Sequence, residues 1–256
     1  MRPAHTPSSR NGPAPQALVI FGGASGIGLA TATAAAAAGR DVTIADLAAT
    51  GDELELVRSG RAQFRHCDAT AVEGVRRVLE EARDRCGRLD GVVITVGGAH
   101  LHDALQVDLD AWRKEISFNL DSAYVVATTA AVLMKEQGGG GAVVTTSSTF
   151  AQVAGSDRVA YCAAKAGVIG LTRSLAAAAA PHGVRVNCVA PHSTDTPRFR
   201  QMIGGDAGLE QRIKSSPLGR ICVPDDLADS ILFLLSPQAR SFTGQVLWVN
   251  NGCYMP

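Results

Sequence analysis

The chain has 256 residues, of which 46% are hydrophobic, so it can bury the core of one large α/β domain or of two small ones, and we expect one. Its 24 basic side chains balance its 24 acidic ones, which excludes a global positive field for nucleic acid or an acidic membrane surface. No apolar stretch approaches the roughly 20 residues that cross a bilayer, and the start lacks the apolar centre of a signal peptide. We therefore expect a cytoplasmic protein whose partner is a small-molecule substrate.

The first 16 residues contain four prolines and no apolar periodicity, which predicts a disordered tail before a domain over 17–256. In that domain short apolar runs alternate with helical stretches. The expected strands are 17–21, 41–45, 62–67, 91–95, 142–147, 184–190 and 245–250. The first expected helix runs through the alanines 34–38 and ends there. The other expected helices cover 52–59, 71–86, 111–136, 157–180 and 225–235. This alternation predicts an α/β fold, a single doubly wound Rossmann domain with a parallel sheet of about seven strands.

Four glycines stand in the ten residues VIFGGASGIG, directly after the first apolar run. Gly22, Gly26 and Gly28 fall between a predicted strand and a predicted helix. Glycine there permits a tight turn, the approach of backbone N–H groups to a pyrophosphate, and close helix packing. The spacing alone is a weak signal, because many glycine-rich turns bind nothing.

Asp46 strengthens the dinucleotide hypothesis, because it ends the second predicted strand, where a carboxylate can accept hydrogen bonds from an adenosine ribose. A 2′-phosphate would meet like-charge repulsion there. Leu47 follows in place of an arginine, and Ser25 occupies a loop position where a cation could have held that phosphate. The pattern favours NAD over NADP, with a solvated strand-end acid as the alternative interpretation of Asp46.

Tyr161 and Lys165 in YCAAK lie four residues apart, hence on one face of a predicted helix. Ser148 precedes that tyrosine in the sequence, after the strand AVVTTS. Together with the glycine loop and Asp46, this pattern resembles the short-chain dehydrogenase/reductase family in its single-domain, NAD-preferring form. The resemblance covers roughly residues 17–255.

The resemblance implies a set of site residues. The family's catalytic tetrad falls on Asn119, Ser148, Tyr161 and Lys165. Its glycine motif implies cofactor contacts at Gly22, Ser25, Gly26, Ile27 and Gly28. Further cofactor contacts are implied at Asp46, Asp68 beside the adenine, Gly97, Tyr161, Lys165, Thr194, and Thr196 at the nicotinamide carboxamide.

Two positions depart from the family's motifs. Phe21 stands where the glycine motif has threonine, and ITVG, Ile94 to Gly97, replaces the family's NNAG. In the family that threonine and the asparagines help to tie neighbouring strands together. We expect apolar packing of Phe21 to replace this polar link.

The tetrad suits hydride transfer between a secondary alcohol and a ketone. A free tyrosine has a pKa near ~10, so Tyr161 needs positive charge to act as a base, and we expect Lys165 and an oxidised nicotinamide to provide it. Ser148 would orient the substrate oxygen, and Lys165 would also hold the nicotinamide ribose. The resemblance implies that Asn119 anchors a water that connects the lysine to solvent.

Three histidines are weaker candidates. His100 and His102 alternate in a predicted loop without a third ligand, so pocket lining is more plausible than a metal pair, and we predict no metal site. His192 replaces the glycine of the family's PG turn, which predicts a position near the nicotinamide or the pocket mouth. A steric role is favoured there over a proton relay.

Residues 193–216 interrupt the alternation and predict a substrate lid. The lid mixes basic and apolar side chains: Arg198, Phe199, Arg200, Met202, Leu209, Arg212, Ile213 and Lys214. Its cations either hold the phosphates of a carrier such as coenzyme A or solvate a mobile helix. We expect oxidation of a hydrophobic cyclic or hydroxyacyl-type alcohol. The alternatives are a 3-oxoacyl thioester reductase and a non-catalytic dinucleotide-binding regulator.

The last residues, FTGQVLWVNNGCYMP, carry more apolar surface than a terminal strand leaves exposed. The resemblance implies a homotetramer built through the last strand and two long helices, 111–136 and 157–180. The six cysteines contain no CxxC pair, which favours reduced thiols.

Overall fold

The computed structural model describes residues 17–48, 51–106 and 108–256, so the predicted tail lies outside the described residues. Over these residues the chain forms one sheet of seven parallel strands in the order β3-β2-β1-β4-β5-β6-β7. The strands are β1 Ala17–Phe21, β2 Asp41–Asp46, β3 Gln63–His66, β4 Gly91–Ile94, β5 Gly141–Thr146, β6 Val184–Pro191 and β7 Val246–Val249. The predicted doubly wound parallel sheet is confirmed.

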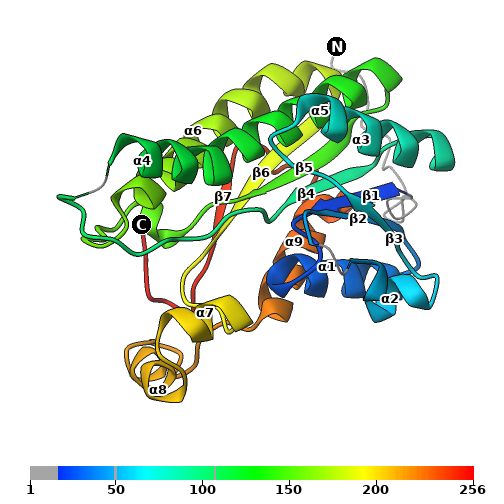
Figure 1. Ribbon diagram of the computed structural model, residues 1–256. Helices are drawn as coiled ribbons and strands as arrows, with labels where there is room; N and C mark the ends of the chain where they lie inside the picture. The colour runs from blue at the N-terminus through cyan, green and yellow to red at the C-terminus, as the bar shows by residue number, and fades with distance from the viewer. Residues whose placement is uncertain (1–16, 49–50, 107) are drawn as a thin grey trace, which may run out of the picture.

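Helices cover both faces of the sheet (Figure 1). One layer holds α1 Gly26–Ala37, α2 Glu55–Arg58 and α9 Pro224–Leu235. The other holds α3 Val72–Cys86, α4 Leu109–Ile116, α5 Ser122–Gln137 and α6 Val159–Ala179. Short helical turns are η1 Gly51–Glu53, η3 Thr149–Ala151, η4 Ala180–His182 and η5 Pro237–Ala239.

Each strand divides its side chains between two cores, because successive residues of a strand point to opposite faces. In β1, Val19 and Phe21 join the core beneath α3 and α5, whereas Leu18 and Ile20 join the core beneath α1 and α9. Both faces of the strand are thus buried. This explains why the strands read as continuous apolar runs in the sequence.

The helix predicted at 111–136 is interrupted by a π-helical turn, η2 Ser117–Asp121, between α4 and α5. The span 109–137 is long and apolar enough to cross a membrane by length and composition, contrary to our expectation of no such stretch. However, 56% of its most apolar 18-residue window is buried inside the protein, where it packs against α3 and α6. That burial is the pattern of a core helix.

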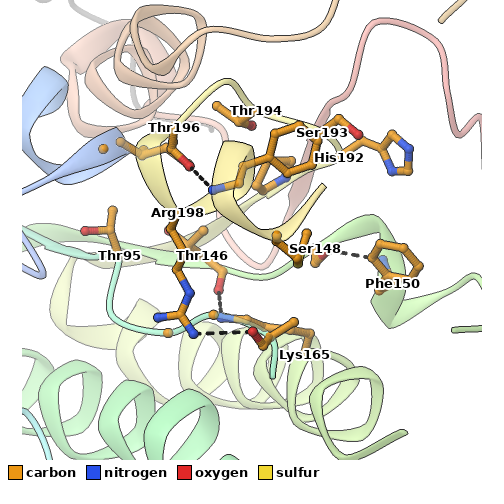
Figure 2. A pocket seen from close by; sticks show the side chains of 18 of the residues that line it. Thr95, Thr146, Ser148, Phe150, Lys165, His192, Ser193, Thr194, Thr196 and Arg198 are labelled. Carbon is orange, nitrogen blue, oxygen red and sulfur yellow. Dashed lines mark hydrogen bonds between the residues drawn. The ribbon is translucent and has the colours of Figure 1, made fainter. Parts of the chain in front are cut away.

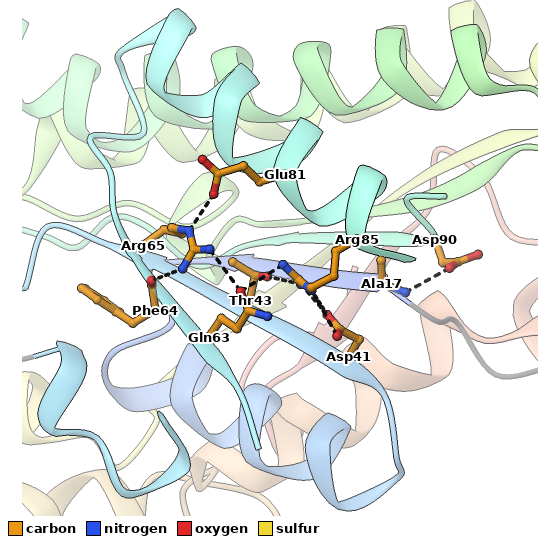
Figure 3. Close-up of polar contacts among 9 residues, drawn as sticks. All are labelled: Ala17, Asp41, Thr43, Gln63, Phe64, Arg65, Glu81, Arg85 and Asp90. Carbon is orange, nitrogen blue, oxygen red and sulfur yellow. Dashed lines mark hydrogen bonds and ion pairs between the residues drawn. The ribbon is translucent and has the colours of Figure 1, made fainter. Parts of the chain in front are cut away.

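A polar network fastens α3 to the edge of the sheet (Figure 3). The guanidinium of Arg85 on α3 pairs with Asp41 at the start of β2. It also donates to Thr43 Oγ1 at 2.8 Å and to Gln63 Oε1 on β3 at 3.1 Å. These contacts fix the two outer strands, so that the opposite end of β2 holds Asp46 at the ligand-binding edge.

The strand order reverses between β1 and β4, so a crevice forms beyond their carboxyl ends, where doubly wound sheets bind ligands. The predicted lid lies beyond the same edge and forms α7 Pro197–Met202 and α8 Asp206–Lys214 (Figure 1). The chain leaves and re-enters the body at one point. There, Thr194 and Cys222 form an isolated bridge, and the Asp195 N–H donates to the Cys222 carbonyl at 2.8 Å.

Candidate active site

A cavity of about 270 Å³ opens in this crevice (Figure 2). The predicted residues that line it are Gly22, Ser25, Gly26, Ile27, Gly28, Gly97, Ser148, Tyr161, Lys165, His192, Thr194 and Thr196. Asn119 is fully buried behind this lining. Asp46 and Asp68 stand outside it, at the carboxyl ends of β2 and β3.

The glycine loop needs its glycines for two separate reasons. Gly22 and Gly26 have φ of +79° and +51°, a backbone conformation that favours glycine. At Gly28 a Cβ would lie 2.2 Å from the Gly22 carbonyl oxygen, so only glycine lets α1 approach β1 this closely. Ser25 precedes α1 and its hydroxyl makes no capping bond, which leaves N–H groups of the first helical turn free for an anion.

Asp46 has a second role that the sequence did not suggest. One carboxylate oxygen accepts from the Ala24 N–H and the other from the Ala48 N–H, both at 3.0 Å. The same side chain therefore shapes the glycine loop. Asp68 is exposed, and one of its oxygens accepts from the backbone and hydroxyl of Thr70 at 2.8 and 2.7 Å.

The prediction that apolar packing of Phe21 replaces the strand link is wrong. Phe21 is indeed fully buried in the core, but the link remains polar. The Thr95 hydroxyl lies 3.0 Å from the carbonyl oxygens of both Phe21 and Gly22. The hydroxyl thus comes from the residue after β4, within ITVG, instead of from β1.

Two contacts with the end of β5 hold the tyrosine–lysine helix, α6. The Lys165 Nζ donates to the Thr146 carbonyl at 3.0 Å, and the Ser147 hydroxyl donates to the Lys165 carbonyl at 2.7 Å. The Lys165 Nζ also lies 5.6 Å from the centroid of the Tyr161 ring. Tyr161 and Lys165 therefore share one wall of the cavity, as the four-residue spacing predicted.

The protonation states of this pair follow from burial. Burial raises the pKa of Tyr161, while a hydrogen bond from Ser148 and the charge of Arg158 act in the opposite direction. Burial also lowers the pKa of Lys165 to about 8, although Cys188 and Glu115 favour its charged form. Within the chain itself, burial outweighs the groups that favour the phenolate, so the net shift of the Tyr161 pKa is upward.

Asn119 lies in the π-helical turn, and its amide is fully engaged. Its Oδ1 accepts from the Gly98 N–H at 2.9 Å, and its Nδ2 donates to the carbonyls of Gly98 and Glu115, each at 3.1 Å. At Gly97, with φ +133°, a Cβ would lie 2.5 Å from Asn119 Oδ1 and 2.9 Å from Lys165 Nζ. The absence of a side chain at Gly97 thus leaves room for both the asparagine and the lysine at this point.

The histidines divide between two environments. His192 lines the cavity, with its Nδ1 2.7 Å from the Thr149 hydroxyl, and its pKa is lowered by burial and then by nearby arginines. The lining prediction for His100 and His102 is wrong. Neither lines the cavity: the His100 Nδ1 lies 2.6 Å from Glu115 Oε2, and the His102 backbone N–H donates to the Asp157 carbonyl.

Arg158 is a cavity residue that the sequence reasoning missed. It is 8% exposed, pairs with Asp157 at 2.6 Å, and lies with its guanidinium carbon 4.4 Å from the Phe150 ring centroid. It directly precedes α6, three residues before Tyr161. That spacing was the available signal.

The lid contributes only part of its predicted set to the cavity. Its lining residues are Pro197, Arg198, Phe199, Met202 and Arg212. Arg200 instead pairs with Asp195 at 2.5 Å and Asp206 at 3.3 Å, and Lys214 lies 4.0 Å from Glu210. Only Arg198 and Arg212 of the four predicted cations can therefore act on a ligand in the cavity.

The lining fits a dinucleotide. Thr194 Oγ1 is buried without a hydrogen-bond partner, and a nicotinamide carboxamide could supply one. The glycine loop and the start of α1 suit the pyrophosphate, while Thr196 faces Gly26 across the cavity, with its Cγ2 3.3 Å from a Cβ built there. Among the residues that the structure describes, no three His, Cys, Asp or Glu side chains gather as a metal site, and all six cysteines are free.

Comparison with known proteins gives a consistent result. A sequence model of a family described as enoyl-(acyl carrier protein) reductase matches residues 22–254. The 2-(S)-hydroxypropyl-CoM dehydrogenase 3 of Xanthobacter autotrophicus is 32% identical over 249 residues, which cover 93% of this chain and 96% of that protein. The cis-4-hydroxycyclohexanecarboxylate dehydrogenase of Sinomonas cyclohexanicum is 36% identical over 243 residues, covering 91% and 94%.

A solved structure agrees with these relatives in fold. The crystal structure of gox2181 is 31% identical, with a TM-score of 0.86 over 94% of this chain and 96% of that one. The parallel sheet flanked by helices is thus the fold of a known group. The chain belongs to the short-chain dehydrogenase/reductase family and is an oxidoreductase of CH–OH groups that uses a nicotinamide cofactor.

Proposed function

We propose that this protein is an NAD-dependent dehydrogenase that oxidises a hydrophobic secondary alcohol, of cyclic or hydroxyacyl type, to a ketone. The observation that carries the proposal is the convergence of Tyr161, Ser148 and Lys165 on one cavity that also contains the glycine loop. A complete catalytic set beside the cofactor loop supports catalysis over a regulatory role for the fold.

A bound oxidised nicotinamide would supply the hydride acceptor for the carbinol carbon and a positive charge in the site. Tyr161 takes the hydroxyl proton at its phenol oxygen. Ser148 orients the substrate oxygen by hydrogen bonding, and the ammonium of Lys165 favours the phenolate. The same residues serve ketone reduction, with Tyr161 as the proton donor.

The cavity wall supports a substrate with apolar and anionic parts. Phe150, Phe199 and Met202 provide apolar surface. Arg198 and Arg212 line the same cavity, and within the described residues neither forms an ion pair with Asp or Glu. The two curated relatives are named for a CoM conjugate and a carboxylate, which supports an alcohol that carries a second, anionic group.

A hydroxyacyl thioester is the favoured special case of such a substrate, because the phosphates of coenzyme A suit the two lid arginines. A relative from Vibrio harveyi that is named 3-oxoacyl-[acyl-carrier-protein] reductase, 31% identical over 188 residues, supports 3-oxoacyl thioester reduction as the second candidate. Both candidates use the same tetrad and differ in direction and in the carrier.

We also propose a cytoplasmic homotetramer. The last strand, β7, is an edge strand, and each of its side chains is only partly buried. On α5, Tyr124 and Val132 are exposed at 54% and 37%. These surfaces coincide with those through which the sequence resemblance predicts assembly.

Tyr161→Phe removes only the phenol oxygen. We expect kcat to fall by about 10²-fold or more, because proton transfer is lost, while NAD affinity is kept. Steady-state kinetics and cofactor fluorescence titration measure the two effects. Tyr124→Phe, at an exposed position on α5, is the control and should keep its activity. Near-normal turnover of Tyr161→Phe would contradict the mechanism.

Asp46→Ala should weaken NAD binding by about 1.5–3 kcal/mol through loss of charge-assisted hydrogen bonds to the ribose. It should also improve the affinity for NADP relative to NAD, because the repulsion is removed. Since Asp46 also holds the Ala24 N–H, Asp46→Asn is the matched control for loop shape. Calorimetric Kd values for both cofactors provide the ratio. A preference of the unaltered protein for NADP would overturn this assignment.

The assembly proposal is tested by light scattering at micromolar concentration. We expect a mass four times that of the 26.5 kDa chain. A mass of one chain would refute the tetramer. Val132→Glu on α5 introduces a charge into the proposed interface and should shift the mass toward smaller species.

The thioester candidate is tested by comparing kcat/KM for a 3-hydroxyacyl-CoA with that for the matching free acid and simple alcohol. We expect a thioester advantage of about tenfold or more, which shrinks at high salt and in Arg198→Ala and Arg212→Ala. Lys214→Ala removes a lid cation outside the cavity lining and serves as the control. Equal kcat/KM values with and without the carrier would leave a simple-alcohol dehydrogenase.

A further inference from the structure

Three charged side chains are buried among the described residues: Glu115, Arg158 and Lys165. Arg158 pairs directly with Asp157. Glu115, on α4, is 4% exposed and pairs only with a histidine, and Lys165 forms no ion pair within the described residues. Burying a carboxylate is costly unless hydrogen bonds and charges compensate for the lost water, so we expect such partners around Glu115.

Hydrogen bonds hold both oxygens of the Glu115 carboxylate. Oε2 lies 2.6 Å from His100 Nδ1. Oε1 accepts from the His100 backbone N–H at 3.3 Å and from Asn119 Nδ2 at 3.4 Å. The carboxylate therefore lies between the catalytic asparagine and the loop that follows β4.

The chemistry of the neighbours indicates which proton His100 carries. The guanidinium of Arg198, from lid helix α7, lies 3.5 Å from His100 Nε2 and has only donors to offer. Nε2 then acts as the acceptor, so Nδ1 carries the proton and donates it to Glu115. The His100 ring is thus a hydrogen-bond donor to the buried Glu115 carboxylate.

In space, one side chain, that of Asn119, stands between the Glu115 carboxylate and the catalytic lysine. Asn119 Oδ1 and Lys165 Nζ both lie within 3 Å of the position where a Gly97 side chain would begin. Asn119 thus contacts Glu115 through its Nδ2 and faces Lys165 with its Oδ1. A buried negative charge and a buried positive charge lie on opposite sides of one amide.

We propose that Glu115 is a positioning residue of the dehydrogenase: its buried negative charge holds Asn119, keeps Lys165 protonated, and thereby sets the pH range of the reaction. His100 completes the arrangement by covering the carboxylate from solvent, with its own side chain 65% exposed. This inference rests on the proposed function, since it assigns a role within the same site.

The electrostatics of the neighbouring groups agree with this role. Burial lowers the pKa of Lys165, and Cys188 on β6 and then Glu115 act against this shift. Glu115 also adds to the upward shift of the Tyr161 pKa that burial causes. The pKa of the Cys188 thiol is itself raised by burial. Tyr161 further faces Ser148, Arg158 and Cys162.

Removal of the negative charge at Glu115 should therefore move the pH profile in one defined direction. With oxidised nicotinamide bound, whose positive charge favours the phenolate, alcohol oxidation needs the Tyr161 phenolate and the Lys165 ammonium. At saturating NAD, formation of the phenolate then defines the acid limb of the pH profile of kcat/KM for the alcohol, and loss of the ammonium defines the alkaline limb. Without the Glu115 charge the phenolate forms more easily and the ammonium is lost more easily. Both limbs then move to lower pH, which a purely structural defect would not cause.

The test measures kcat/KM against pH for Glu115→Gln, which keeps the size of the side chain and an oxygen for Asn119. We expect both limbs to move to lower pH by on the order of one unit. Glu115→Asp keeps the charge and should leave both limbs near their original positions. If Glu115→Gln lowers the maximum kcat/KM but leaves both limbs at their original pH, the proposal is overturned.

Two further measurements keep the test decisive. His100→Ala alters only an exposed ring and admits water to Glu115, so it should move the limbs in the same direction by a smaller amount, and unmoved limbs count against the proposal. Tyrosinate absorbance against pH, with Tyr161→Phe as reference, reports Tyr161 without turnover. A lowered Tyr161 pKa in Glu115→Gln supports the inference even if no alcohol is oxidised, and an unchanged pKa refutes it.

Discussion

The substrate end of the molecule depends on the clamp between the Asn119 amide and the Gly98 peptide, whose N–H and carbonyl it binds at 2.9 and 3.1 Å. β4 ends at Ile94, and the last backbone bond that continues its pairing with β1 runs from the Thr95 N–H to the Phe21 carbonyl at 2.9 Å. A buried amide that satisfies both polar groups of one peptide gives the segment after Thr95 a single position. Lys165 then finds space beside the segment only because Gly97 has no side chain.

The clamp requires the π-helical turn between α4 and α5. This turn inserts an extra residue into an otherwise regular helix, and such turns concentrate at functional sites. The sequence predicted one unbroken helix at 111–136, because apolar periodicity averages over several turns and does not register one added residue. The strands, in contrast, were predicted to within two residues, since burial on both faces leaves a continuous apolar run.

The part of the site that is formed by residues at short, regular spacings in the sequence could be predicted. The four-residue step from Tyr161 to Lys165 and the glycines of the loop are local patterns, and these residues line one cavity. The roles of Glu115 and Thr95 depend instead on residues distant in sequence. In AWRKEISF, Glu115 looks like one more charge on a surface helix, and nothing local indicates that it is buried against His100.

The lid is joined to the body at one point, where Thr194 and Cys222 form a bridge between its two ends. Within it, Arg200 pairs with Asp195 before α7 and with Asp206 at the start of α8, so the two short helices are linked to each other. Such a closed excursion can change length and sequence with little effect on the sheet, because the cost of closing a loop rises slowly with its length. In evolutionary terms, residues 193–216 can be exchanged as a unit. Substrate preference can then change while Ser148, Tyr161 and Lys165 keep their positions.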